Sequence, residues 1–152
     1  MAGTVVLQVR RRLVEAWRSD GRLNGIEIHY SHPGADLVGE KAIIFGPAVI
    51  PEATPVGHRA TRIRREETVE QPVLITCWLD GLDQEEADEV SVGILTVVEG
   101  LLAEDVQVDG AAGEDQQVIS LTLKSWRQLA GTTDRGHASE IEFVLGYNAR
   151  SL

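Results

Sequence analysis

The chain has 152 residues, of which 43% are hydrophobic and 25% charged, and its net charge is −10. This is the composition of a globular protein, and one domain over residues 1–152 is the simplest organisation at this length. No apolar run approaches the roughly 18 residues of a membrane-spanning helix. No positively charged segment precedes an apolar run, as it would in a secretory signal. We therefore expect a single domain with no membrane partner.

The charges are divided unevenly along the chain. Residues 66–123 contain fifteen acidic residues and neither lysine nor arginine, whereas residues 1–65 have a net charge of +4. A segment without positive charge is unsuited to binding nucleic-acid phosphates. Two interpretations stay open for it: a solvated acidic face that maintains solubility, or an acidic surface that meets the basic part of a neighbouring subunit.

The first third of the chain predicts a helix and two strands. The helix spans Thr4 to about Ser19, with Thr4 as its N-cap and an apolar stripe at helical spacing. Strict alternation predicts a strand over residues 26–30, and a more apolar run predicts a second strand over residues 42–50, in which Gly46-Pro47 marks a bulge or an edge.

A projecting loop or hairpin is predicted over about residues 51–70. Two prolines and a glycine within residues 51–57 predict a loop. The following run, residues 58–68, is polar on both faces, so neither face of it suits a core.

This hairpin contains a basic cluster, whose members are Arg59, Arg62, Arg64 and Arg65. A hairpin tip solvated by water is one explanation. The alternative is docking of the cluster onto an acidic partner surface, because arginine forms bidentate pairs with carboxylates.

The most regular part of the sequence is a strand, an Asp-Gly turn and a helix. Alternate residues over 69–79 are apolar, and an apolar stripe over 83–103 has helical spacing. The stripe consists of Ala87, Val90, Ile94, Val97, Val98 and Leu101. Asp83 with Glu86 three residues later is a capping-box pattern. Cys77 falls on the apolar face of the strand, which predicts a buried thiol.

The first turns of this helix are acidic, with Glu85, Glu86, Asp88 and Glu89 close together. Carboxylates at a helix N-terminus interact favourably with the positive end of the helix dipole, and this structural role is sufficient to explain them. The functional alternative is an acidic subunit interface formed by these four residues.

The last third of the chain predicts strands over residues 106–108, 118–123 and 140–147. A turn is expected at residues 109–115 and a longer loop at residues 126–138. The elements together predict an α+β fold. Two helices pack on one face of a single mostly antiparallel or mixed sheet, from which the hairpin projects.

The sequence contains no catalytic motif that we recognise. It has neither a Gly-x-Ser-x-Gly elbow nor a phosphate-binding loop. His29 and His32 lie close together but lack a cysteine partner, which favours surface histidines over a metal site. We therefore predict no catalytic residue, no metal and no cofactor.

The order of these elements resembles the tail terminator proteins of long-tailed bacteriophages. The resemblance is carried by Arg64-Arg65-Glu66-Glu67-Thr68, which leads into the strand and Asp-Gly turn of residues 73–81, and by the acidic helix of residues 83–103. The opening helix with its short strand and the late pair of strands extend it over most of the chain.

The resemblance implies a non-catalytic virion protein of the tail or neck, assembled in the host cytoplasm and needing no cofactor. Such proteins form a homohexameric ring that caps the tail tube, ends its polymerisation and joins the tail to the head-side connector. In such a ring the basic cluster, Arg59, Arg62, Arg64 and Arg65, would contact a neighbouring subunit or the tube, and the acidic residues Glu85, Glu86, Asp88 and Glu89 would line the lumen or an interface. The implied partners are further copies of the chain, the tail tube protein and a connector or stopper protein, while DNA passes through the channel without specific binding. Two other functions stay open: another neck protein, such as a head–tail stopper or connector, or a small cytosolic α+β enzyme or ligand-binding domain.

Overall fold

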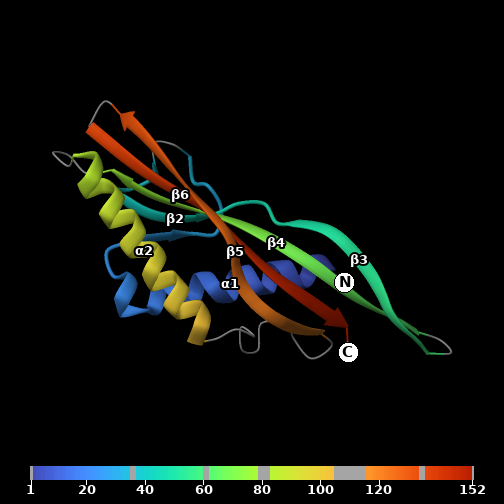
Figure 1. Cartoon of the computed structure of the whole chain (residues 1–152). Coiled ribbons are helices and arrows are strands. Elements are labelled where there is room, and N and C mark those ends of the chain that lie inside the picture. The colour runs from blue at the N-terminus through green and yellow to red at the C-terminus, as the bar shows by residue number, and fades with distance from the viewer. Residues whose placement is uncertain are drawn as a thin grey trace.

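The computed structural model describes residues 2–34, 37–59, 62–78, 83–104, 116–133 and 136–151. These residues form two α-helices and a six-stranded sheet (Figure 1). In chain order the elements are α1 (Ala2–Ser19), the 3-10 helix η1 (Gly21–Leu23), β1 (Glu27–His29), β2 (Lys41–Phe45), β3 (Val49–Arg59), β4 (Arg62–Trp78), α2 (Gln84–Glu104), β5 (Gln116–Thr133) and β6 (Gly136–Ser151). The strands lie in the order β1-β2-β4-β6-β5, with β3 also beside β4. Among the described strands only β1 and β2 pair in parallel, so the predicted α+β class with a mixed sheet is confirmed.

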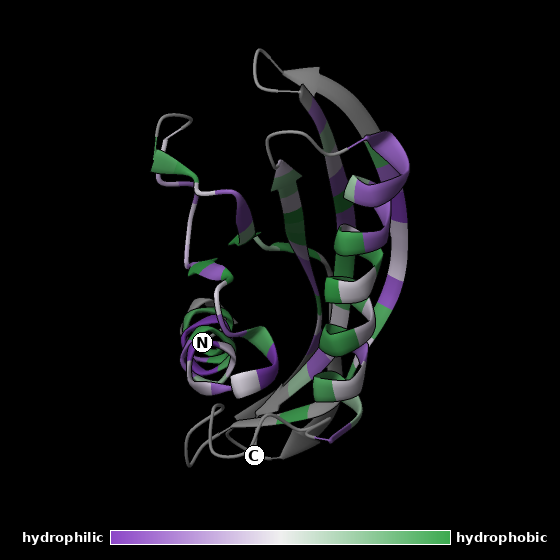
Figure 2. Ribbon diagram, turned by 90° about the vertical axis from the view of Figure 1, so that its left-hand side faces the viewer, coloured by the Kyte–Doolittle hydropathy of each residue, from purple (hydrophilic) through white to green (hydrophobic). Residues whose placement is uncertain are grey.

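Both helices cover the same face of the sheet and share one hydrophobic core with it. Side chains of neighbouring strands meet there in rows, such as Ile43, Ile75 and Ile141, which lie opposite one another and are fully buried. From α1, the Trp17 ring lies 5.3 Å from the Phe45 ring of β2, measured between centroids. Figure 2 shows α1 nearly end-on and α2 from its side, so the two helices cross the sheet in different directions. The predicted placement of both helices on one face is therefore confirmed.

The first helix forms where the sequence predicts it, with its buried side chains three or four residues apart. They are Val5, Val6, Val9, Leu13, Val14 and Trp17. The helix begins at Ala2, however, so the prediction of Thr4 as its N-cap is wrong, because Thr4 lies within the first turns.

The second helix also forms as predicted, and Asp83 caps it. The Asp83 carboxylate Oδ1 accepts a hydrogen bond of 2.8 Å from the backbone N–H of Glu86, which satisfies a donor that has no partner within the helix. Its buried residues are Ala87, Ser91, Ile94, Leu95, Val98 and Leu102. The predicted stripe correctly contained three of these; it also contained Val90, Val97 and Leu101, which are only partly buried and flank the core.

The inward faces of the central strands match the predicted alternation. In β6 the buried residues Ile141, Phe143, Leu145 and Tyr147 are those expected to face the core. Cys77 of β4 is fully buried, as predicted, and burial raises the pKa of its thiol.

Strand β4 changes its partner at Pro72. On one edge it pairs with β2 from Val73 to Cys77 and with β3 from Arg62 to Glu70, whereas β6 accompanies it along the other edge. The carbonyl of Pro72 accepts a 2.9 Å hydrogen bond from the N–H of Gly46, so the proline nitrogen, which has no hydrogen, faces the same edge. The expected single strand over residues 42–50 is therefore wrong: it is interrupted at residues 46–48, opposite the missing donor.

The expected loop at residues 51–57 is also wrong, because these residues belong to β3. Proline is tolerated in an edge strand and at bulges, where its missing N–H breaks no ladder bond. The register of β3 against β4 shifts between Val49 and Glu52 and again between Pro55 and Gly57, so both prolines lie at irregular points. The predicted hairpin is confirmed, and both of its sides are strands.

The expected loop at residues 126–138 is wrong as well. Strand β5 continues through it to Thr133, and β6 begins at Gly136, so most of this segment forms the distal part of a hairpin. Its glycines and threonines are typical of a loop, which hid the strand, but pairing along the whole length of β6 supplies the backbone hydrogen bonds. The strand and turn predicted within residues 106–115 lie outside the described residues.

A buried polar network joins α1 to the point where β4 changes partner. The guanidinium Nε of Arg10 donates to Oε1 of Gln71 at 3.1 Å, and Gln71 is 2% exposed. The amide Nε2 of Gln71 donates to the carbonyls of Gly46 at 2.7 Å and Pro72 at 2.8 Å. The Arg10 guanidinium also lies over the Tyr30 ring, 4.8 Å from its centroid. Gln71 thus satisfies backbone groups at the interruption in the sheet and holds α1 over it.

We predict that Gln71→Leu lowers the free energy of unfolding by about 1–3 kcal/mol, because it leaves the Arg10 guanidinium and the Gly46 carbonyl buried without a partner. Urea denaturation measures the effect. The double variant Arg10→Met/Gln71→Leu should cost less than the sum of its two single changes, because no orphaned guanidinium remains. Strict additivity would contradict the network, and Arg11→Met, at an exposed position of the same helix, should change the value by no more than about 0.5 kcal/mol.

Candidate assembly surfaces

The four arginines predicted as an interface lie on a two-stranded extension of the sheet. Strand β6 pairs with β4 only from Glu66 onward, so residues 55–59 and 62–65 pair with each other alone. We call these residues the arm. In its backbone register Arg59 lies opposite Arg62, and Arg64 and Arg65 follow on the same strand. The side chains of these four arginines lie outside the described part of the structure.

The acidic residues of α2 line a hollow between the helix and β5. Three of the four predicted residues, Glu85, Asp88 and Glu89, contribute to it, whereas Glu86 is exposed without lining it. The hollow is open and has a volume of about 670 Å³, and we call it the acidic depression. The rest of its lining comes from Val92, Gly93, Thr96 and Gln128.

Beside the acidic depression, α2 leaves the core-facing side of the distal part of β5 uncovered, whereas Val118 and Leu121 earlier in the strand are buried in the core. Trp126 lies opposite the buried Phe143, and Gln128 lies opposite the buried Ile141, so both share the face that elsewhere forms the core. Trp126 is nevertheless 49% exposed, and Val92 on the facing side of α2 is 39% exposed. A large aromatic ring and an aliphatic side chain therefore flank the carboxylates at the surface.

The start of α2 is held rigidly against β6. The Gln84 amide Nε2 donates to Asp88 Oδ1 at 2.9 Å and to the Ala138 carbonyl at 3.1 Å. About two turns after Gln84, the hydroxyls of Ser91 and Ser139 form a buried hydrogen bond of 2.7 Å. These bonds fix the carboxylates of the first turns in position relative to the sheet.

The arm and the acidic depression lie at opposite ends of the molecule. Strand β4 begins in the arm at Arg62, and Ile75 near its far end lies in the same row as Gln128 of the depression. At about 3.3 Å per residue, the eleven positions from Arg64 to Ile75 span roughly 35 Å. Figure 1 shows the β3–β4 hairpin extending away from the domain on the side opposite the first turn of α2. The sequence suggested both surfaces, but only the fold separates them.

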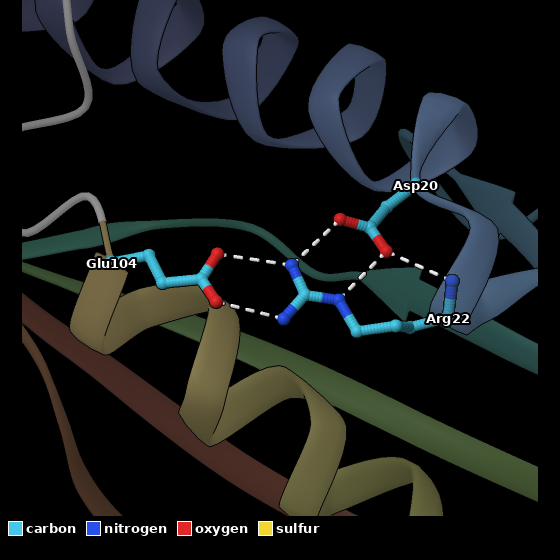
Figure 3. Close-up of polar contacts among 3 residues, drawn as sticks. All are labelled: Asp20, Arg22 and Glu104. Atoms are coloured by element: carbon cyan, nitrogen blue, oxygen red, sulfur yellow. Dashed lines mark hydrogen bonds and ion pairs between the residues drawn. The ribbon is translucent and has the colours of Figure 1, made fainter.

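A third polar cluster, which the sequence analysis missed, connects the ends of the two helices (Figure 3). The Arg22 guanidinium in η1 donates to both carboxylate oxygens of Glu104 at the end of α2, at 2.8 and 2.9 Å. It also donates to both carboxylate oxygens of Asp20, at 3.0 and 2.9 Å. Asp20 lies two residues from Arg22 in the sequence, whereas Glu104 lies 82 residues from it. No local sequence pattern signals the distant contact.

This cluster offsets an unfavourable charge. Glu104 lies at the negative end of the α2 dipole, where a carboxylate is destabilised, and Arg22 supplies the compensating cation. Hydrogen bonds from Arg22 lower the pKa of both Asp20 and Glu104, and the two carboxylates together raise the pKa of Arg22. All three side chains are partly exposed, so the contribution to stability is modest and falls with salt.

Within the described ranges, no group of three or more histidine, cysteine, aspartate or glutamate residues is arranged to hold a metal ion. His29 Nε2 lies 3.3 Å from Glu27 Oε1, and His32 Nδ1 accepts a hydrogen bond from the N–H of Gly34. Neither of the two described helices is long and apolar enough to cross a membrane.

The fold has a counterpart among solved structures. A chain from the virion of a native gene transfer agent particle matches with a TM-score of 0.56 over 90% of this chain and 91% of that chain. The two sequences are 12% identical, so the similarity concerns the fold alone. No protein-family model and no curated protein matches this sequence.

We predict that Arg22→Ala lowers the melting temperature slightly at neutral pH, and that this difference disappears in acid. The folded-state pKa values of Asp20 and Glu104 are lowered, so their contribution is complete above about pH 5 and is lost as the pH falls through the folded-state values. Thermal unfolding followed by circular dichroism between pH 7 and pH 2.5 measures the difference. A difference of constant size across this range would contradict the role of the cluster, and Arg11→Ala, at an exposed position in α1, serves as control.

Proposed function

We propose that this chain is a structural protein of a phage-like virion. The observation that carries the proposal is the agreement of fold over nearly the whole length of both chains, since a common motif alone would cover only part of each. The matched chain belongs to a virion of a gene transfer agent. On this basis the chain has no catalytic role and is located in the virion.

Within this class, we propose the role of tail terminator. The chain would form a hexameric ring that caps the tail tube, stops its polymerisation and joins the tail to the head-side connector. The order of elements supports this role through the resemblance of the sequence to tail terminators. The arm also supports it, because a basic extension beyond the domain is suited to reach a neighbouring subunit or the tube.

A second neck protein, such as a head–tail stopper or connector, is the alternative. It would share the virion location and the ability to form rings, and the two roles differ in the particle that accumulates when the protein is lacking. An enzyme or ligand-binding domain would instead need a pocket with converging polar groups. The acidic depression is open and its carboxylates carry charges of the same sign, which suits a surface contact better than a substrate site.

We predict that the purified chain binds the open ends of tail tubes as a ring with six times the 16.6 kDa mass of one chain. Light scattering after size exclusion and negative-stain microscopy of tubes with added protein measure this. Particles assembled without the protein should show tails of uncontrolled length without heads. Tails of normal length that fail to join heads would indicate a stopper or connector, and normal complete particles would overturn the proposal.

A further inference from the structure

We propose that the arm of one copy binds the acidic depression and the adjoining uncovered face of β5 on the next copy. The inference rests on the proposed ring and names the surfaces that form it. It predicts a head-to-tail contact in which every subunit contributes its arm to one neighbour and its depression to the other.

The arm needs a partner for structural reasons. A two-stranded ribbon that extends beyond its sheet has no hydrophobic face of its own and is marginally stable in isolation. Four arginines within seven residues, Arg59 to Arg65, add mutual repulsion to it. Binding to a surface rich in carboxylates would relieve this repulsion and order the ribbon.

The receiving surface has complementary chemistry. Glu85, Asp88 and Glu89 supply carboxylates, with which arginine forms charge-assisted, often bidentate hydrogen bonds. Trp126 and Val92 supply exposed apolar area beside them, and guanidinium groups stack on aromatic rings. Tryptophan and arginine are the residues that most often dominate binding energy at protein interfaces. Residues 66–123 contain neither lysine nor arginine, so this segment places no positive charge near the site that would repel the arm.

The separation of the two surfaces determines the kind of assembly. Because about 35 Å of β4 lies between the arm and the depression, one chain cannot satisfy both within itself. Contacts between two different surfaces are heterologous, and repeated contacts of this type close into a ring when the rotation between subunits permits. Opposite charges at opposite ends of each chain therefore favour head-to-tail contacts, which are the contacts that a ring needs.

The test uses two charge-reversed variants of the full chain. The arm variant carries Arg62→Glu and Arg64→Glu, and the depression variant carries Glu85→Lys and Glu89→Lys. We expect each variant alone to stay monomeric under conditions in which the wild type assembles. Mixed in equal amounts, they should assemble into rings in which the two variants alternate. The intact arm of one variant meets the intact depression of the other, and the reversed arm meets the reversed depression.

Two further measurements make the result specific. A chain that carries all four reversals should assemble again, because the charges are exchanged and stay complementary. If the depression variant also carries Trp126→Phe, formation of the mixed assembly should reduce quenching of the arm variant's Trp126 by acrylamide. The control, Glu15→Lys with Glu40→Lys, changes the net charge by the same amount as the depression variant. Its two positions are exposed and lie elsewhere, so it should assemble like the wild type.

The contact is overturned if both variants assemble normally, or if their mixture stays monomeric while the wild type assembles. An acidic lining of the ring lumen would give the first of these results. Tube binding by the wild type is scored separately, so the two proposals can fail independently. Tube capping by the wild type without assembly of the mixture would overturn only this contact, and assembly of the mixture without tube capping by the wild type would overturn only the terminator role.

Discussion

The architecture depends on a missing hydrogen-bond donor in the middle of its longest central strand. Pro72 has no N–H, and its nitrogen faces the edge of β4 on which β2 ends and β3 begins. The interruption at Gly46 coincides with this point, and the Gln71 side chain supplies a bond to the Gly46 carbonyl there. The buried Arg10 then ties α1 to Gln71. One proline thus separates the part of β4 that lies in the core from the part that continues into the arm.

This division places opposite charges at opposite ends of the molecule. The core half of β4 leads into α2, whose capped and acidic first turns are fixed against β6 by Gln84 and Ser91. The other half leads away from the helices into the ribbon that contains four arginines. Since α2 does not cover the distal part of β5, the face that would otherwise lie in the core stays open there beside the carboxylates. A strand partly in the core and partly outside it therefore accounts for both candidate surfaces.

Regular segments with a clear apolar period could be predicted, and irregular or polar segments could not. The two helices, the inward face of β6 and the cap at Asp83 follow from spacing and local chemistry. The strands over residues 51–57 and 126–133 were mistaken for loops, because their composition signals a loop while pairing with a long neighbour supplies the strand. The contact of Arg22 with Glu104 joins residues far apart in sequence and has no local signal at all.

The sequence by itself determined the α+β class, both helices and the residues of the basic and acidic clusters, because these depend on period, capping and charge. Only the tertiary structure decided where the clusters lie relative to one another. Their separation depends on the length of β4 and on its change of partner at Pro72, both of which arise from pairing between distant segments. The exposure of Trp126 was decided in the same way, since it depends on where α2 ends its cover of the sheet.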